Sequence, residues 1–408
     1  MLKTILFIIE LVLFIYLSMA LLYITTFGIA ALFARKKKAV PPSFFRKIAV
    51  LIPGYKEDHI IVEVAKDALE QEYPKDKYEV IVIADSFKPE TITALNEIPV
   101  RVVEVVFEIS KKSKALNKCM AIIGDEYDIA VVLDADNIMA HDVLHKINLA
   151  FDKGFVAVQG HRMAKNTNTP YALLDAISEE INNTIFRKGH RVVGLSSALI
   201  GSGMGIDYAL FKKTMATVDS VGEDKELELK LLKQGHTIEY VNDACIYDEK
   251  TSKSEVFVNQ RRRWVAAQLD YFRRYFFDGF YQLISKGNID YFDKVMQMIQ
   301  PPRIILTGLL FIFSISSLLT HALKLASVQA LFILDYRYWL PMFLSASFIL
   351  LISVPKKFYN KHSLRALLYL PHGFILMTKS IMRIKGARKR FIHTTHHHTE
   401  TFDKSKMN

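Results

Sequence analysis

The chain has 408 residues, of which 51% are hydrophobic, so it can bury a sizeable core. Its two cysteines, Cys119 and Cys245, lie far apart in apolar-rich stretches, which predicts two core residues and argues against a disulfide framework or a four-ligand zinc site. Lys and Arg number 53 against 42 Asp and Glu, which gives a net charge of +11. Such a basic excess suits nucleic acid, anionic lipid or phosphorylated substrates, and the positions of the charges decide among them.

Three apolar stretches approach or exceed the length of about 20 residues that a helix needs to cross a bilayer. They are Thr4–Ala34, Ile304–Leu323 and Tyr338–Val354. The first runs directly into the basic cluster Arg35–Lys38 and lacks the short apolar core of a signal peptide. Because basic flanks stay in the cytosol, we expect the amino terminus outside and residues 39–303 inside. The sequence therefore predicts an integral protein of a bacterial inner membrane or a plasma membrane.

A further apolar stretch, Leu364–Ile384, is interrupted by Pro371, His372 and Lys379. A crossing there would place the basic residues that follow it outside, so we expect an interfacial or re-entrant helix. The tail segment His393–His398 is expected to face solvent or lipid headgroups rather than a metal. A membrane surface thus explains the basic excess, and we predict no nucleic-acid partner. The expected division is a transmembrane helix at 1–40, a cytosolic domain at 41–300, two transmembrane helices at 301–355, and an interfacial helix with its tail at 356–408.

Short β-branched runs alternate with helical patterns in the central segment, which predicts an α/β domain with a mainly parallel sheet. The expected strands are Lys47–Ile52, Tyr78–Ala84, Val100–Val106, Ile129–Leu133, Phe155–Gln159 and Thr237–Val241. Helices are expected near Tyr171–Arg187 and Lys225–Gln234. In open sheets of this kind, ligands bind beyond the carboxyl ends of the strands, so the residues that follow each strand are candidates for a site.

Two charged motifs follow predicted strands. Asp134-Ala135-Asp136 ends a strand, and two carboxylates at this spacing suit a divalent cation that neutralises a diphosphate. Taken alone, the pair is equally typical of a turn at a strand end. The basic cluster Lys111–Asn117 opens a predicted helix, where the lysines and the helix dipole suit phosphate oxygens. Taken alone, this cluster is also typical of a solvated face.

Three motifs lie further along the chain, and each has a structural alternative. Gly201–Gly205 is a glycine-rich turn that either lets the backbone approach a ligand closely or forms an ordinary loop. Gly222-Glu223-Asp224 precedes a predicted helix, so Asp224 is either a helix cap or a general base that takes a proton from an acceptor hydroxyl. Gln260–Trp264 places three arginines and an indole on a helix. These side chains suit a diphosphate and a sugar ring, whereas a basic helix lying on lipid would show the same pattern.

Taken in order, these motifs resemble the family 2 glycosyltransferases of the GT-A fold. The resemblance is to the membrane-integrated branch that contains cellulose, hyaluronan, chitin and poly-N-acetylglucosamine synthases, and it spans residues 48–264. It implies a Rossmann-like α/β domain flanked by transmembrane helices. The Gln-x-x-Arg-Trp motif of this branch, matched by Gln260, Arg263 and Trp264, separates it from the dolichyl-phosphate mannose synthases.

The resemblance also implies a role for each matched residue. The implied donor-binding residues are Pro53, Tyr55, Glu57, Asp85, Lys112, Asp134 and Arg263. Asp136 is implied as the ligand of Mg²⁺ or Mn²⁺, and Asp224 as the catalytic base. The implied acceptor-binding residues are Gly203, Glu223, Gln260 and Trp264. Two positions depart from the family pattern, because Lys56 stands where Asn is usual and Gly222 where Thr is usual.

The reaction that the resemblance implies is a metal-dependent inverting displacement on a nucleotide-diphosphate sugar, with a UDP-sugar as the expected donor. Repeated transfer would build a β-linked polysaccharide at the lipid bilayer, with further membrane or export subunits as candidate partners. A single addition to a lipid acceptor is the alternative, because ceramide glucosyltransferases resemble the same set of motifs. A nucleotide-sugar-binding subunit without activity is a third reading, against which the presence of both Asp136 and Asp224 argues.

Overall fold

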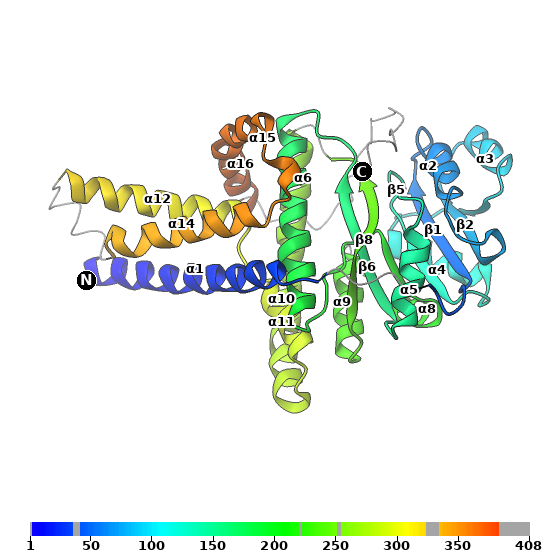
Figure 1. The fold of residues 1–408 in the computed structure, drawn as a ribbon, viewed down its shortest axis with the longest axis horizontal. Coiled ribbons are helices and arrows are strands. Elements are labelled where there is room, and N and C mark those ends of the chain that lie inside the picture. The colour runs from blue at the N-terminus through cyan, green and yellow to red at the C-terminus, as the bar shows by residue number, and fades with distance from the viewer. Residues whose placement is uncertain (1, 36–40, 221, 251–253, 324–333, 383–408) are drawn as a thin grey trace.

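The computed structural model describes residues 2–35, 41–220, 222–250, 254–323 and 334–382. An α/β domain forms one end of the molecule and a bundle of long helices forms the other (Figure 1). Two helices, α6 (Pro170–Asn182) and α10 (Ser254–Lys286), stand between the sheet and the bundle. The amino terminus lies at the far end of the bundle.

One sheet of eight strands organises the described part of the domain, in the order β3-β2-β1-β4-β7-β6-β8-β5. The strands are β1 (Ile48–Tyr55), β2 (Tyr78–Asp85), β3 (Arg101–Val105), β4 (Ile129–Val132), β5 (Ile138–Met139), β6 (Ala157–Ala164), β7 (Met204–Asp207) and β8 (Ile238–Asp248). Strands β3, β2, β1 and β4 are parallel, whereas β7 is antiparallel to both of its neighbours and β5 is antiparallel to β8. Six of the eight described strands thus run in one direction, so the sheet is mainly parallel, as the sequence predicted, with β7 and β5 reversed.

Both faces of the sheet are buried, because successive side chains of a strand point to opposite faces. In β1, Leu51 packs on the face that also holds Met120 of α4. Its neighbour Ile52 packs on the opposite face with Leu144 of α5. Burial on both faces explains why the central strands are continuously apolar runs rather than alternating ones.

Short helices cover these two faces. They are α2 (Ile61–Ala68), α3 (Pro89–Asn96), α4 (Lys112–Ile123), α5 (Val143–Asp152), α8 (Tyr208–Met215) and α9 (Glu223–Lys233), with a 3₁₀ turn η1 (Lys75–Lys77). Helix α4 follows β3 directly along the chain, so its first residue, Lys112, lies near the carboxyl edge of the parallel strands. This placement brings a basic helix amino terminus to the edge at which ligands of such sheets bind.

Helix α6 continues through a π-helical segment, η2 (Asn183–Gly189), into the short helix α7 (His190–Val192). A Cβ atom at Gly189 would lie 2.1 Å from the carbonyl oxygen of Phe27 in the first helix, so only glycine allows this approach of the two backbones. Helix α10 is followed by α11 (Ile289–Gln297), which packs against it. These contacts fasten the α/β domain to the helices of the bundle.

The bundle contains α1 (Leu2–Leu32), α12 (Arg303–Ala322) and α14 (Tyr336–Ile352), which lie side by side (Figure 1). They share an apolar core that includes Leu17, Leu310 and Trp339. Residues 4–32 and α12 are long and apolar enough to cross a membrane, and α14 is a shorter apolar helix. The following segment packs beside them as η3 (Lys356–Phe358), α15 (Lys361–Ala366), η4 (Leu367–Tyr369) and α16 (Leu370–Met382).

Several elements differ from the sequence predictions. The glycine-rich segment 201–205 was expected to be a turn, but its second half forms the start of β7. The strand expected to end at Val241 continues to Asp248. The helix expected from Lys225 begins at Glu223, so Glu223 and Asp224 lie in its first turn. Cys119 is buried as predicted, whereas Cys245 is only partly buried. The tail segment 393–398 and most of the basic cluster 35–38 lie outside the described residues.

Candidate active site

A cavity of about 2530 Å³ opens at the carboxyl edge of the sheet and continues past α6 and α10 to the bundle. Eleven of the thirteen residues assigned from the sequence line this one cavity. They are Pro53, Tyr55, Glu57, Asp85, Lys112, Asp134, Asp136, Glu223, Asp224, Arg263 and Trp264. Residues as far apart in the sequence as Pro53 and Trp264 are thus brought together around one space.

The end of the cavity that the sequence assigns to the donor begins where β1 and β2 end. Tyr55 pairs with Asp85 in the register of these strands, and Asp85 is only 3% exposed. The next residue, Lys56, has a left-handed backbone with φ of 56°, and its amide donates to the carbonyl oxygen of Asp85 at 3.1 Å. Asn adopts the left-handed conformation more readily than Lys. The backbone at this position therefore explains why Asn is usual there in the family that the sequence resembles.

Lys112 joins two sides of the cavity. Its ammonium group donates to the carboxylate of Asp134 and, at 2.7 Å, to the carbonyl oxygen of Gly201. Burial alone would lower the pKa of Lys112, but the nearby charges of Asp134 and Glu223 raise it overall, so the side chain stays a cation. A fixed cation between a strand end and a glycine loop is a suitable partner for the phosphates of a donor.

Asp136 is 6% exposed, and its carboxylate accepts from the backbone amide of Glu249 at 2.9 Å and from the side chain of Asn137 at 3.1 Å. Within the described part of the chain, no group of three or more His, Cys, Asp and Glu side chains is arranged to hold a metal by itself. Asp134 and Asp136 nevertheless fit Mg²⁺ or Mn²⁺, because such ions commonly take one or two carboxylates and complete their shell with substrate phosphates and water.

Glu223 and Asp224 form a second acidic pair in the first turn of α9. Burial raises the pKa of Glu223 to about 7, and the adjacent charge of Asp224 adds to the rise although Lys112 opposes it. Burial also raises the pKa of Asp224, and Glu228 contributes in the same direction. A Cβ at Gly201 would lie 3.5 Å from the Cβ of Asp224, so the glycine loop and this carboxylate are in contact. A carboxylate with a raised pKa on a cavity wall suits general base chemistry.

Helix α10 contributes Arg263 and Trp264 to the cavity. Trp264 is 42% exposed, and the guanidinium of Arg261 lies 4.5 Å from the centre of its ring. Arg261 also lines the cavity, and it pairs with Asp175 of α6. One face of the indole is therefore covered by a cation. The side chain of Gln260 lies outside the described ones.

Gly203 is placed differently from the expectation that it binds an acceptor. Among the described residues that line the cavity, Gly201 is present and Gly203 is not. The carbonyl oxygen of Gly203 accepts from the amide of Gly160 at 2.7 Å, and a Cβ at Gly203 would lie 2.9 Å from the Ile246 side chain. Gly203 is thus needed for close strand packing behind the cavity wall, and the loop position that faces the cavity is Gly201.

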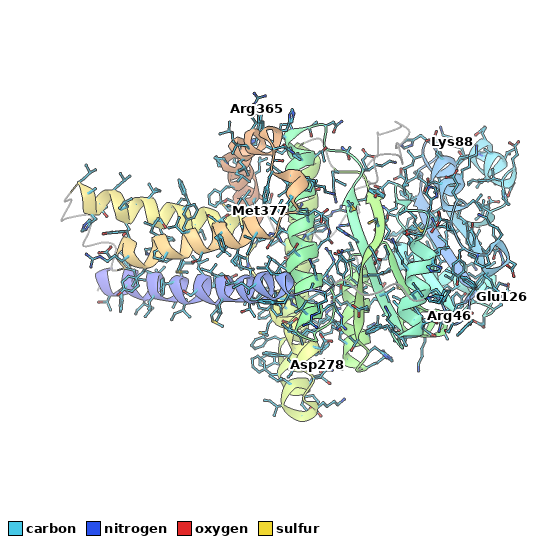
Figure 2. All side chains as sticks on the ribbon, in the orientation of Figure 1. Arg46, Lys88, Glu126, Asp278, Arg365 and Met377 are labelled. Carbon is cyan, nitrogen blue, oxygen red and sulfur yellow. The ribbon has the colours of Figure 1, made fainter. Side chains whose placement is uncertain are left out.

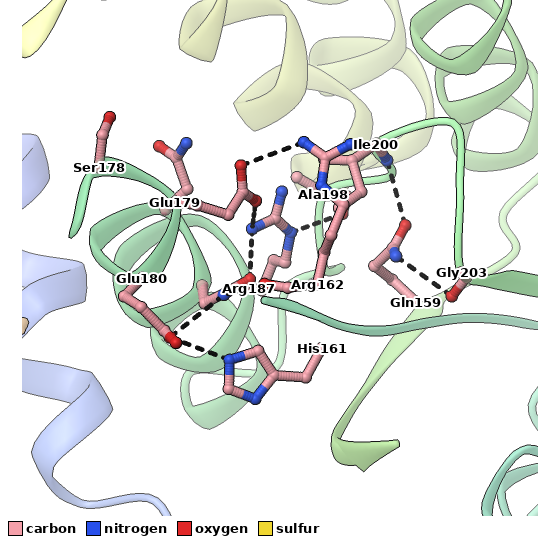
Figure 3. Close-up of polar contacts among 12 residues, drawn as sticks. Gln159, His161, Arg162, Ser178, Glu179, Glu180, Arg187, Ala198, Ile200 and Gly203 are labelled. Carbon is pink, nitrogen blue, oxygen red and sulfur yellow. Dashed lines mark hydrogen bonds and ion pairs between the residues drawn. The ribbon is translucent and has the colours of Figure 1, made fainter. Parts of the chain in front are cut away.

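A buried ion cluster was not recognised in the sequence (Figure 3). The carboxylate of Glu179 accepts from Arg162 and Arg187, each at 3.1 Å. Asp248 pairs with Lys250 at 2.8 Å and with Arg162 at 3.4 Å. Burial raises the pKa of Asp248 to about 6, and the charge of the nearby Asp136 adds to the rise. All five residues line the cavity. Asp248 is the last residue of β8, and polar residues at strand ends are candidates for a site. The sequence prediction missed Asp248 because it ended this strand at Val241.

The other end of the cavity is apolar. It is lined by side chains of α12, α14 and α16, among them Ile304, Phe311, Phe343, Leu351, Phe374 and Met377. Met377 is labelled in Figure 2 on the helix that lies above α12 and α14. The cavity therefore connects an acidic and basic donor region to a space between helices of the bundle.

Comparison with solved structures gives the fold class that the sequence predicted. A mannosyltransferase from Pyrobaculum calidifontis, PcManGT, solved in complex with GDP-Man and Mn²⁺, superposes with a TM-score of 0.51 at 18% identity. The superposition covers 88% of this chain and all of that chain. The fold is therefore that of the GT-A glycosyltransferases, as the sequence predicted.

Sequence comparison identifies the family. The family described as Glycosyltransferase like family 2 matches residues 45–267, and the chain belongs to it. "Probable glycosyltransferase YdaM" of Bacillus subtilis is 27% identical over 233 residues, covering 53% of this chain and 54% of that protein. A "Beta-monoglucosyldiacylglycerol synthase" of Nostoc sp. is 24% identical over 225 residues, covering 53% and 48% respectively. The chain thus spans about half the length of these curated relatives.

Proposed function

We propose that this chain transfers a sugar from a nucleotide-diphosphate sugar to an acceptor that reaches the site from the membrane. The observation that carries the proposal is the single cavity, in which a polar donor region continues into an apolar space between α12, α14 and α16. The expected donor is a UDP-sugar. The expected topology keeps the α/β domain in the cytosol, with α1, α12 and α14 crossing the membrane and α16 at its surface.

The proposed reaction is a single displacement with inversion. Asp224 takes the proton of the acceptor hydroxyl, the hydroxyl oxygen bonds to the anomeric carbon, and the bond from that carbon to the diphosphate breaks. Lys112 and Arg263 hold the departing diphosphate through charge-assisted hydrogen bonds. A divalent cation held by Asp136, with Asp134 beside it, would supply further positive charge to the same leaving group. The product would be β-linked if the donor is α-linked.

The apolar end of the cavity favours a lipid acceptor over a growing glycan. A glycan carries hydroxyl groups along its whole length, so it needs a groove lined with hydrogen-bonding side chains. Side chains such as Phe311, Phe343 and Phe374 instead suit hydrocarbon. A relative is named for synthesis of monoglucosyldiacylglycerol, which agrees with this choice. Polymerisation, with its candidate export subunits, is the second reading.

The test is product analysis with the purified chain in lipid. It would be incubated with a panel of nucleotide sugars, Mg²⁺ or Mn²⁺, and the host lipids, and the size and linkage of the product determined. One sugar on a lipid supports the proposal, whereas a soluble ladder of glycans would replace it by polymerisation.

A matched pair of variants tests the base. Asp224→Asn should lower turnover by at least about a hundredfold and leave donor binding nearly unchanged, because the amide keeps the shape but accepts no proton. Asp125→Asn is the control, since its side chain is 79% exposed and pairs with Lys212 away from the cavity. Turnover of Asp224→Asn within about tenfold of the parent would refute the assignment.

A further inference from the structure

Helix α12 begins on the side of α6 that faces away from the sheet (Figure 1). The residues that line the cavity change there from polar to apolar. Arg303 is the first residue of α12 and lines the cavity at this boundary. Ile304 and Gly308, its neighbours on the same helix, line the apolar part. A charged side chain is thus held beside a space suited to hydrocarbon.

Among the described residues, the hydrogen-bond partners of Arg303 are neutral groups of α6. Its guanidinium donates to the side-chain oxygen of Asn182 at 2.6 Å, to the hydroxyl of Ser178 at 2.8 Å and to the carbonyl oxygen of Ser178 at 2.9 Å. No carboxylate of the described residues forms an ion pair with it. Arg261 and Arg187 contact the same helix, but they pair with Asp175 and Glu179. Arg303 therefore has no ion-pair partner of its own among the described residues, and the charges of Glu179 and Asp175 act on it only from a greater distance.

The backbone adds to the positive potential at this place. Helix α12 has 20 residues, and its amino terminus is preceded by Pro302, which supplies no side-chain cap. Pro301 and Pro302 also line the cavity, so the positive end of the helix dipole faces it. A partly buried guanidinium without an ion-pair partner is unfavourable, and an anion beside it would satisfy both the guanidinium and the helix terminus.

The donor diphosphate is unsuited to be this anion. Its proposed partners are Lys112 at the sheet edge and Arg263 on α10, whereas Arg303 sits at the start of a bundle helix beyond α6. An anion at Arg303 would instead have the apolar part of the cavity directly next to it. This arrangement matches a molecule with a phosphate at one end and hydrocarbon at the other.

We propose that Arg303 and the amino terminus of α12 bind the phosphate of a lipid acceptor, whose hydrocarbon chains occupy the space between α12, α14 and α16. This inference rests on the proposed function and specifies its acceptor. Because Asp224 needs a hydroxyl to deprotonate, the acceptor is a phospholipid that carries a free hydroxyl in its headgroup. The phosphate would position that hydroxyl, and it would take no part in the exchange of bonds at the anomeric carbon.

Binding of short-chain probes to the full chain in detergent tests the proposal. The probes are dioctanoyl phosphatidylglycerol, dioctanoylglycerol and inorganic phosphate. The parent should bind the phosphatidylglycerol at least about tenfold more tightly than the neutral lipid, which is typical of a charge-assisted contact. Arg303→Gln should reduce this preference to within about threefold, and Arg303→Lys should retain part of it.

Arg365→Gln is the matched control, because it removes the same charge from an exposed position on α15 (Figure 2). It should keep the preference of the parent. The inference is overturned if the parent shows no preference, or if Arg303→Gln keeps it. If inorganic phosphate bound as tightly as dioctanoyl phosphatidylglycerol, the site would recognise free phosphate and the proposed lipid ligand would be wrong.

Nucleotide binding measured in the same samples separates the two proposals and reports folding. Arg303→Gln should bind UDP as the parent does. If Arg303→Gln loses UDP binding, Arg303→Lys becomes the deciding variant. It must then still bind dioctanoyl phosphatidylglycerol more tightly than dioctanoylglycerol. Intact nucleotide binding without a lipid preference defeats only the acceptor inference. A parent that binds no nucleotide or nucleotide sugar would defeat the proposed function itself.

Discussion

Replacing Glu179 by Gln should destabilise the chain strongly, because this carboxylate is the shared anion of a buried cluster. It accepts from Arg162 and Arg187 at 3.1 Å each, and Lys250 lies 3.9 Å away. Arg187 is 2% exposed and Lys250 is 3% exposed. Glutamine keeps the shape and one acceptor oxygen but removes the charge. The buried Arg187 then loses its carboxylate partner, whereas Arg162 and Lys250 keep Asp248. Removing one partner of a buried ion pair typically costs about 3–5 kcal/mol.

This free energy corresponds to a large shift of the thermal midpoint. For a domain of roughly 150–250 residues, each kcal/mol changes the midpoint by about 2–4 °C, so we expect a decrease of roughly 6–20 °C. The fluorescence of Trp264 and Trp339 during heating, at a fixed scan rate in detergent, would report it. Glu126→Gln is the control, because Glu126 pairs with Lys47 at 2.5 Å but is 57% exposed and should contribute less than about 1 kcal/mol.

The effect of Glu179 should also depend on pH. Burial alone would raise the pKa of Glu179, but the charges of Arg162, Arg187 and Lys250 hold it well below its usual range. A carboxylate with a lowered pKa stabilises the folded state fully above its unfolded pKa, and this stabilisation is lost as the pH falls through the folded pKa. The difference between parent and Glu179→Gln should therefore be full at pH 7 and shrink in acid. A midpoint within about 2 °C of the parent at pH 7 would refute the reasoning.

Three further predictions concern the candidate active site. The acidic limb of the kcat/KM profile should lie at higher pH than an ordinary aspartate would give, because burial raises the pKa values of Glu223 and Asp224 and the base acts only when deprotonated. Glu223→Gln should shift this limb to lower pH by removing a negative charge beside Asp224, and an unchanged limb would contradict the pairing. Asp136→Ala should weaken donor binding and abolish its dependence on Mg²⁺ or Mn²⁺, which isothermal titration with and without chelator would measure. Lys56→Asn should stabilise the fold by about 0.5–1 kcal/mol because Asn tolerates the left-handed backbone, and a lower thermal midpoint would count against the strain.

Local patterns were sufficient to predict the elements that carry the donor site. The apolar run at Lys47–Ile52 and its successors correspond to β1 to β4, and each run ends at a polar cluster. Strands β1, β2 and β4 are buried on both faces, whereas β3 is an edge strand with Glu104 exposed. Most of the site residues that were assigned from the motifs and their order line one cavity in the structure. These features depend on short stretches of sequence, so a single chain is enough to recognise them.

Features that depend on distant contacts could not be predicted in this way. Nothing near Glu179 in sequence indicates that it pairs with Arg162, and nothing near Arg303 indicates that Asn182 binds it. Gly203 was assigned to the acceptor because a glycine-rich turn suits a ligand, but its neighbour Ile246 comes from another strand and makes it a packing position. Which glycine of such a segment faces a cavity is decided by the pairing of the strands.

Helix α6 connects both halves of the proposed chemistry. Toward the sheet, its Glu179 anchors the ion cluster that holds Arg162 of β6. Toward the bundle, its Ser178 and Asn182 hold Arg303 at the start of α12. These residues lie within one turn of the same helix, so a shift of α6 would move the acceptor region relative to Asp224 and the donor region together. The rigidity that the buried charges give to α6 is therefore what we expect to keep a hydroxyl of a membrane lipid in register with a sugar bound at the sheet edge.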